Sequence, residues 1–249
     1  YSCGCLTESN GASASIMTDT IDHPPLIRLG NIEFIPDVSG ALYAPTLSLL
    51  VVADLHFEKG SSLARRGRGL LPPYDTIETI NRLSKVIERL NPTRVISLGD
   101  TWHEPQALAR MTSEDVNHLR KLQRDREWSF ISGNHDSELP HGAGFMITND
   151  VRIEGIAFRH EPSNTGLMPE ISGHFHPVVR VKARGRALRR RCFVANDQRC
   201  ILPAFGAYTG GLNILDDAFM PLINRFDATI FALGTDRVYR IGSEHLIPD

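Results

Sequence analysis

The residues of this chain best suited to chemistry are aspartates and histidines that stand where apolar runs end. In LLVVADLHFEKG, an apolar run that begins at Leu49 leads into Asp54 and His56. Side chains two residues apart on an extended chain share one face, so we expect Asp54 and His56 to point together while Leu55 points toward the core. A carboxylate beside an imidazole can ligate a metal ion or move a proton. The pair alone is weak, because an Asp that ends a strand and a surface His give the same pattern.

The same kind of ending recurs along the chain, always in front of an oxygen or imidazole side chain. Gly99, Gly133 and Gly173 each precede such a residue, as expected where the backbone turns sharply and approaches an ion closely. Strand ends of this kind are where open α/β sheets place their sites. The full set is Asp54, His56, Asp100, Asn134, His135, His160, His174 and His176.

The donor types in this set narrow the chemistry. Carboxylate, amide and imidazole donors without a thiolate favour Mn, Fe, Zn, Ni or Mg over a structural thiolate zinc site. The donors outnumber what one ion takes from a protein, and a carboxylate such as Asp100 can bridge. The set therefore suits two divalent ions about 3.5–4 Å apart, the spacing of two-metal phosphoryl-transfer sites.

The elements that must position these residues begin as alternating strands and helices. Strand patterns cover 26–29, 31–35, 41–43, 48–53 and 94–100, and a strand starts at Trp128. Between them, helical spacing predicts a helix that begins at Asp75, with Glu78 in a D-x-x-E cap, and is stopped by Pro92; a second helix begins at Thr112. The remainder reads mostly as strands. This order predicts an α/β fold with two sheets packed face to face and helices outside.

Charge, hydropathy and cysteine usage limit the class of protein and its domain organisation. The 249 residues carry a net charge of −2, and no apolar run approaches the length that spans a bilayer. We interpret residues 1–22, which lack the pattern of a secretory signal, as a disordered extension, and residues 23–249 as a single domain. Cys192 and Cys200 flank a predicted turn at Asn196–Asp197 and are expected to stay reduced, in keeping with a cytoplasmic protein.

The ordered series D-x-H, G-D, G-N-H-D, H and G-H-x-H, over residues 48–176, resembles the calcineurin-like metallophosphoesterase superfamily. The resemblance implies an α/β/β/α sandwich with two mixed β-sheets. It also implies that Asp54, His56 and His176 hold one metal with Asp100, which bridges to a second metal held by Asn134, His160 and His174. His135 is then the catalytic group beside the leaving oxygen, and hydrolysis needs no covalent enzyme intermediate.

Segments outside the metal motifs carry a closer resemblance. EKGSSLARRG from Glu58, FRHEP around His160, RRRCF from Arg189 and PAFGAYTGGLN from Pro203 are similar to the bacterial ligase-associated DNA damage response endonucleases, the PdeM family. This similarity implies Mn-dependent cleavage of single-stranded or nicked DNA in repair, alongside a DNA ligase and helicase system. A phosphomonoesterase, a small-molecule phosphodiesterase and a non-catalytic scaffold of the same fold are the alternatives.

Local charge agrees with a polyanionic substrate. The segment from Lys182 to Arg191 has six basic residues in ten and no acid, and a second basic cluster follows the first metal motif. A solvated basic loop is the competing interpretation, because aromatic residues for base stacking are few. The predicted DNA contacts are Arg65, Arg66, Arg68, Lys182, Arg184, Arg186, Arg189, Arg190 and Arg191.

Overall fold

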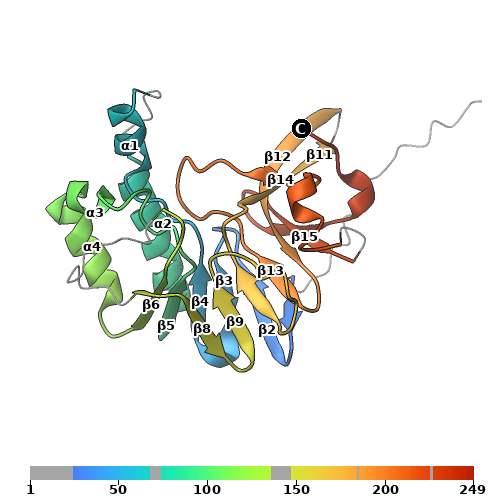
Figure 1. The fold of residues 1–249 in the computed structure, drawn as a ribbon, viewed down its shortest axis with the longest axis horizontal. Coiled ribbons are helices and arrows are strands. Elements are labelled where there is room, and N and C mark those ends of the chain that lie inside the picture. Colours follow the sequence, from blue (N-terminus) through green and yellow to red (C-terminus); the bar gives the residue numbers. More distant parts are fainter. Residues whose placement is uncertain (1–24, 68–73, 136–146, 184, 225–226) are drawn as a thin grey trace, which may run out of the picture.

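Two mixed β-sheets pack against each other, and four α-helices lie on the outer side of the first sheet (Figure 1). The structure is a computed structural model that describes residues 25–67, 74–135, 147–183, 185–224 and 227–249. Arg68, Arg184 and the predicted extension 1–22 lie outside these residues. The predicted α/β class with two mixed sheets is confirmed.

The first sheet has seven strands in chain order, and its antiparallel half is followed by a parallel half. The parallel pairs β4–β5 and β5–β6 bring three carboxyl ends to one edge, which is what places the first motifs together. The strands are β1 (Ile27–Leu29), β2 (Ile32–Pro36), β3 (Leu42–Ala44), β4 (Leu49–Val52), β5 (Arg94–Ser97), β6 (Glu127–Ile131) and β7 (Ile147–Thr148).

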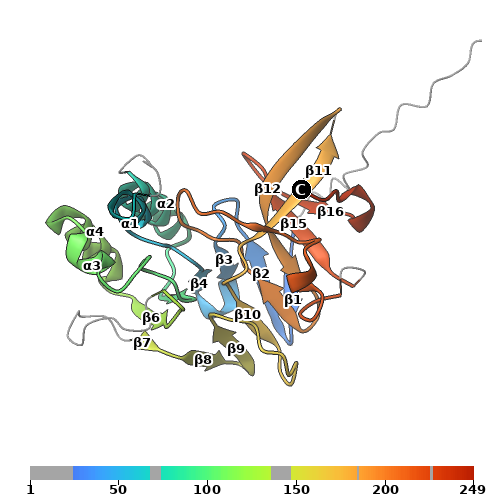
Figure 2. The same cartoon turned by 45° about the horizontal axis from the view of Figure 1, so that its top comes forward.

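The second sheet has nine strands, and its strands β9, β10 and β13 run parallel. Its longest pair, β11 and β12, forms a hairpin that projects beyond the rest of the sheet (Figure 2). In order of position the strands are β14 (Leu212–Asn213), β11 (Pro177–Ala183), β12 (Arg186–Ala195), β13 (Arg199–Ile201), β10 (Glu170–Ser172), β9 (Ile156–Arg159) and β8 (Asp150–Ile153), with β15 (Thr229–Leu233) beside β12 and β16 (Val238–Ile241) beside β15.

The core lies in three layers that follow from the apolar faces of the two sheets. Phe34, Val51 and Phe158 belong to the layer between the sheets. The outer face of the first sheet packs against the helices, and the outer face of the second packs against residues around Phe219. The helices are α1 (Lys59–Arg65), α2 (Asp75–Leu90), α3 (Ala107–Arg110) and α4 (Ser113–Gln123), with 3-10 turns η1 (Pro45–Leu47), η2 (Asp217–Phe219) and η3 (Ser243–His245).

Helix α2 begins where predicted but is not capped as predicted. Tyr74 is the N-cap and supplies no side-chain cap bond, while Asp75 already lies in the helix. The Asp75 carboxylate is instead directed to helix α1, where it accepts a hydrogen bond from the Gly60 N–H at 3.0 Å. The predicted cap was therefore wrong, because a tertiary contact took the carboxylate. The Thr112 start of α4 is confirmed, with a cap bond from the Asp115 N–H.

Cys192 and Cys200 are free and buried. The strand register pairs Cys200 with Ala195 and Cys192 with Ala232, so the two thiols face different partners across the sheet. Burial raises the pKa of both thiols above the ordinary range. Within the described part of the chain, none of the helices combines the length and apolar character needed to cross a bilayer.

Candidate metal centre

The predicted ligands converge where strands of both sheets end. The first sheet supplies the residues that follow β4, β5 and β6, and the second supplies those that follow β9 and β10. Parallel pairing brings these carboxyl ends together within each sheet. Two groups can each hold an ion, because one ligand atom from every member lies within 4.8 Å of the others. These groups are Asp54, His56 and His176, and Asp54, Asp100 and His160.

The backbone at these positions is left-handed rather than extended. Asp54 and His56 have φ of 55° and 46°, and β4 already ends at Val52. The prediction that Asp54 and His56 share one face of an extended strand was therefore wrong, although both side chains do face the centre. Asp100, His174 and His176 also have positive φ. Non-glycine residues in this region are strained by about 1–2 kcal/mol each, and such strain concentrates at functional sites.

The first group places imidazole nitrogens and a carboxylate face to face. His176 Nε2 lies 3.4 Å from Asp54 Oδ1 and 3.4 Å from His56 Nε2. Two ring nitrogens that face each other share at most one proton, so at least one lone pair points at the other ring. The Asp54 carboxylate is held in place by the His174 backbone N–H, which donates to Oδ2 at 3.1 Å. This donor set fits a divalent ion.

Asp100 faces one histidine of each candidate group, His56 of the first and His160 of the second. Its Oδ1 accepts a hydrogen bond from the His135 backbone N–H at 2.9 Å. Its Oδ2 faces His56 Nε2 at 3.8 Å and His160 Nε2 at 3.6 Å. One oxygen is thus fixed by the backbone while the other is directed at a histidine of each group, which is the arrangement that a bridging carboxylate needs.

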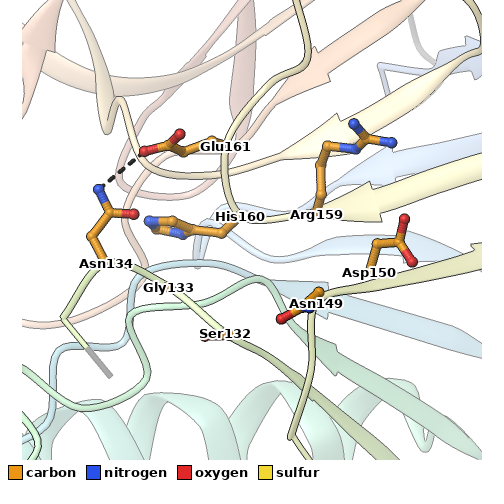
Figure 3. Close-up of a pocket in the computed structure, with 8 residues that line it drawn as sticks. All are labelled: Ser132, Gly133, Asn134, Asn149, Asp150, Arg159, His160 and Glu161. Carbon is orange, nitrogen blue, oxygen red and sulfur yellow. Dashed lines mark hydrogen bonds between the residues drawn. The ribbon is translucent and has the colours of Figure 1, made fainter. Parts of the chain in front are cut away.

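The second group centres on His160. Its Nδ1 donates to the Leu98 carbonyl at 2.9 Å, which leaves Nε2 as the lone-pair nitrogen. That nitrogen lies 3.1 Å from His174 Nδ1. Asn134 approaches from the other side, and its amide nitrogen donates to Glu161 Oε1 at 3.0 Å (Figure 3). With the amide nitrogen directed at Glu161, the amide oxygen of Asn134 is turned toward the His160 ring (Figure 3).

Two glycines make room for this packing. A Cβ on Gly133 would lie 2.2 Å from Asp100 Oδ1 and 2.3 Å from the Asp100 backbone nitrogen. A Cβ on Gly99, which has a φ of +77°, would lie 2.5 Å from His160 Nδ1. The sequence predicted that these glycines let the backbone approach an ion. In the structure, Gly133 and Gly99 instead let the ligand residues Asp100 and His160 pack against the backbone.

His135 stands beside the first group without being part of it. Its Nδ1 donates to the His103 carbonyl at 2.8 Å, so Nε2 is the nitrogen left for exchange of a proton. The ring stacks on His103, with centroids 4.9 Å apart, and meets His56 edge-on. This exposed imidazole has a fixed orientation at the rim of the centre.

Burial and neighbouring charges set the protonation of the histidines. Burial, with repulsion from His176, holds the pKa of His56 well below its ordinary value. Burial and His160 lower the pKa of His174. Burial also lowers the pKa of His176, but the hydrogen bond with Asp54 and the negative charges of Asp54 and Asp100 together outweigh burial, and the pKa is raised. His56 and His174 are therefore neutral at pH 7 and able to bind a metal ion without losing a proton.

Some of the predicted DNA-contact residues bind other groups of the protein, and others have no such partner among the described residues. Alternation along β12 directs Arg189 and Arg191 to one face of the hairpin and Arg190 to the other. Arg191 donates to the Ala204 carbonyl at 2.7 Å, and burial followed by repulsion from Arg82 lowers its pKa to about 10. Arg189 donates to the Gly211 carbonyl at 2.6 Å.

Arg66 forms an ion pair with Glu104 at 2.7 Å. Glu104 also pairs with Arg110, so this cluster ties α1 and α3 together. Three of the predicted DNA-contact arginines, Arg66, Arg189 and Arg191, therefore bind groups within the protein. The residues that stay exposed with no acidic partner in the described part of the chain are Arg65, Lys182, Arg186 and Arg190.

Three residues near the centre were not singled out as site residues from the sequence. His103 Nδ1 lies 3.3 Å from His56 Nδ1, and Glu161 Oε1 lies 3.5 Å from His174 Nε2. Lys59 borders a cleft together with His174 and His176. Glu161 and Lys59 lie close in the chain to His160 and His56, so proximity to a motif histidine was the available signal.

Among solved structures, the chain is similar to the crystal structure of Pseudomonas putida nuclease MPE. The TM-score is 0.70 and the sequence identity is 28%, over 88% of this chain and 100% of that one. The similarity is consistent with a nuclease of the metallophosphoesterase type and does not separate the PdeM group from others. No protein-family model matches this chain, and no curated protein matches it.

Proposed function

We propose that this protein is a metal-dependent phosphodiesterase that cleaves DNA, with two divalent ions in its centre. The observation that carries the proposal is the position of Asp100 Oδ2 between His56 and His160, one histidine from each group. The structural similarity to a nuclease, which covers 88% of this chain and 100% of that one, supports a nucleic-acid substrate. A role in DNA repair follows only from the resemblance to the PdeM family.

We assign each donor residue to one of two ion positions. Asp54, His56 and His176 would hold one ion and Asn134, His160 and His174 the other, with Asp100 shared. The lone-pair assignment of His160 supports this division, because its Nε2 faces Asp100 and His174 while its Nδ1 is occupied by the Leu98 carbonyl. Oxygen and imidazole donors without thiolate suit Mn, Fe, Zn, Ni or Mg, and the resemblance to the PdeM family favours Mn among these. Bound ions would supply positive charge to the phosphoryl oxygens and activate a water molecule.

The protein's own groups account for the proton and the leaving oxygen. Hydrolysis consumes one water, forms a new P–O bond, breaks the bond to the leaving oxygen and delivers a proton to that oxygen. We assign this delivery to His135, and the hydrogen bond from its Nδ1–H to the His103 carbonyl, which leaves Nε2 to carry the proton, supports the assignment. A positioned acid of this kind contributes about 10²–10⁴-fold to the rate.

The test is hydrolysis by purified protein loaded with Mn. We expect cleavage of single-stranded DNA and of bis-p-nitrophenyl phosphate, loss of both on chelation, and recovery when Mn is added back. The substrates that complete the test are nicked plasmid and p-nitrophenyl phosphate. Faster hydrolysis of the monoester than of either diester would overturn the proposal in favour of a phosphomonoesterase.

A further inference from the structure

A half-buried cation that forms no hydrogen bond or ion pair among the described residues borders the candidate metal centre. Lys59 is the first residue of α1, and it shares a cleft of about 460 Å³ with His174, His176, Gly210 and Gly211. In the described part of the chain its ammonium group has no hydrogen bond and no ion pair. Burial lowers the pKa of Lys59 and the charge of Asp75 opposes this, but Asp75 accepts the Gly60 N–H through Oδ2 and forms no ion pair with Lys59 among the described residues.

The cleft places the charge of Lys59 beside two histidines of the centre, His174 and His176. Divalent ions in the centre would add to this positive charge. A half-buried ammonium group facing bound cations is unfavourable unless an anion lies between them.

The arginines close to this region are committed elsewhere. Arg66 and Arg110 pair with Glu104, and Arg189 and Arg191 donate to backbone carbonyls. Among the described residues, Lys59 is therefore a cation that lines the cleft beside His174 and His176 and forms no ion pair.

The lining of the same cleft includes backbone donors. Gly210 and Gly211 lie in the loop that follows β13, and their N–H groups have no hydrogen-bond partner among the described residues. The space where a Cβ of Gly210 would lie is empty to 4 Å. Gly211 is packed so closely that a Cβ would lie 2.5 Å from the His176 carbonyl oxygen. Free backbone N–H groups beside a lysine are a common setting for phosphate oxygens.

We infer that Lys59, which lines this cleft together with Gly210 and Gly211, binds the non-bridging oxygens of the phosphate that is hydrolysed. This inference rests on the proposed function and names the protein group that recognises its substrate. The chemical class bound is a phosphate diester held between the ammonium group and the metal centre, rather than a distant phosphate of the DNA backbone. Because a small diester has only that one phosphate, it must depend on Lys59 as strongly as DNA does.

The test compares Lys59→Met and Lys59→Arg with the matched control Lys85→Met, a lysine exposed on α2. Each Mn-loaded protein is assayed for kcat and KM with bis-p-nitrophenyl phosphate and single-stranded DNA, for inhibition by inorganic phosphate, and for bound Mn. We expect Lys59→Met to lose about 10- to 100-fold in kcat/KM on both substrates and a similar factor in phosphate affinity, since hydrogen bonds to charged groups are of that strength. We expect Lys59→Arg to recover most of the loss, and bound Mn and the control to match the wild type.

Each other outcome has a distinct meaning. A loss confined to DNA would overturn the inference, because Lys59 would then contact a flanking phosphate. A loss of Mn in Lys59→Met, or a Lys59→Arg variant as impaired as Lys59→Met, would indicate a structural role and overturn it too. Wild-type protein that hydrolyses neither diester would instead refute the proposed function.

Discussion

Substitution of Gly133 by alanine tests whether the position of Asp100 determines activity. The new Cβ would lie 2.2 Å from Asp100 Oδ1 and 2.3 Å from the Asp100 backbone nitrogen. An ordinary contact is about 3.4 Å, so the two segments must separate by about 1.2 Å. The backbone nitrogen cannot rotate away as a flexible side chain can, and the movement also disturbs the bond from the His135 N–H to Oδ1.

A displacement of about 1 Å at a reacting group costs on the order of 100-fold in rate. Overpacking costs about 1–3 kcal/mol of stability, which a domain of this size can tolerate. We therefore expect Gly133→Ala to fold, to lose at least about 100-fold in kcat/KM for bis-p-nitrophenyl phosphate, and to bind Mn more weakly by calorimetric titration.

Gly242→Ala is the matched control. Its Cβ would also lie 2.2 Å from a carboxylate oxygen, but that oxygen belongs to the exposed side chain of Glu244, which can turn aside. We expect this variant to keep full activity. If Gly133→Ala folded normally and retained activity and Mn affinity within threefold of the wild type, the reasoning about Asp100 would be refuted.

Three further predictions concern the ligands, the histidine cluster and the basic hairpin. Asp100→Ala and His174→Ala should each reduce diester hydrolysis below a tenth of wild type with an unchanged circular dichroism spectrum; greater residual activity would contradict their assignment as ligands. Burial and His135 lower the pKa of His103 to about 4, so between pH 6.5 and 4 the unfolded metal-free chain binds more protons than the folded one. The free energy of unfolding should therefore fall as the pH drops from about 6.5 to 4. His103→Gln should flatten this pH dependence in denaturant titrations, and an unchanged dependence would contradict the role assigned to His103. Replacing Lys182, Arg186 and Arg190 with glutamine should weaken DNA cleavage and its salt dependence, by about one unit of log–log slope per lost phosphate contact, while small-diester hydrolysis persists; equal loss of both would exclude a DNA groove here.

The sequence predicted the fold and the convergence of the motif residues because both depend on local patterns. Apolar runs ending in Asp54, Asp100 and Asn134 mark parallel strands, and parallel pairing brings their ends to one edge. The second sheet was predicted only as a series of strands, since nothing local specifies that β15 pairs with β12 rather than with β13.

What the sequence could not predict depends on tertiary contacts. Asp75 has the spacing of a cap residue, but the Gly60 N–H of a neighbouring helix takes its carboxylate. Arg191 belongs to a run of three arginines, but alternation in β12 turns it toward the carbonyls of another loop. The sequence places Lys59 close to His56, but its lack of a partner among the described residues appears only once the surrounding arginines are seen to be paired.

The central claim is that two divalent ions share Asp100. Its most direct test is a crystal structure of the Mn-loaded protein with an anomalous difference map collected near the Mn absorption edge. We predict two peaks about 3.5–4 Å apart, one beside Asp54, His56 and His176 and the other beside Asn134, His160 and His174, with Asp100 Oδ2 between them. A single peak after full Mn loading, or two peaks that Asp100 does not bridge, would contradict the account.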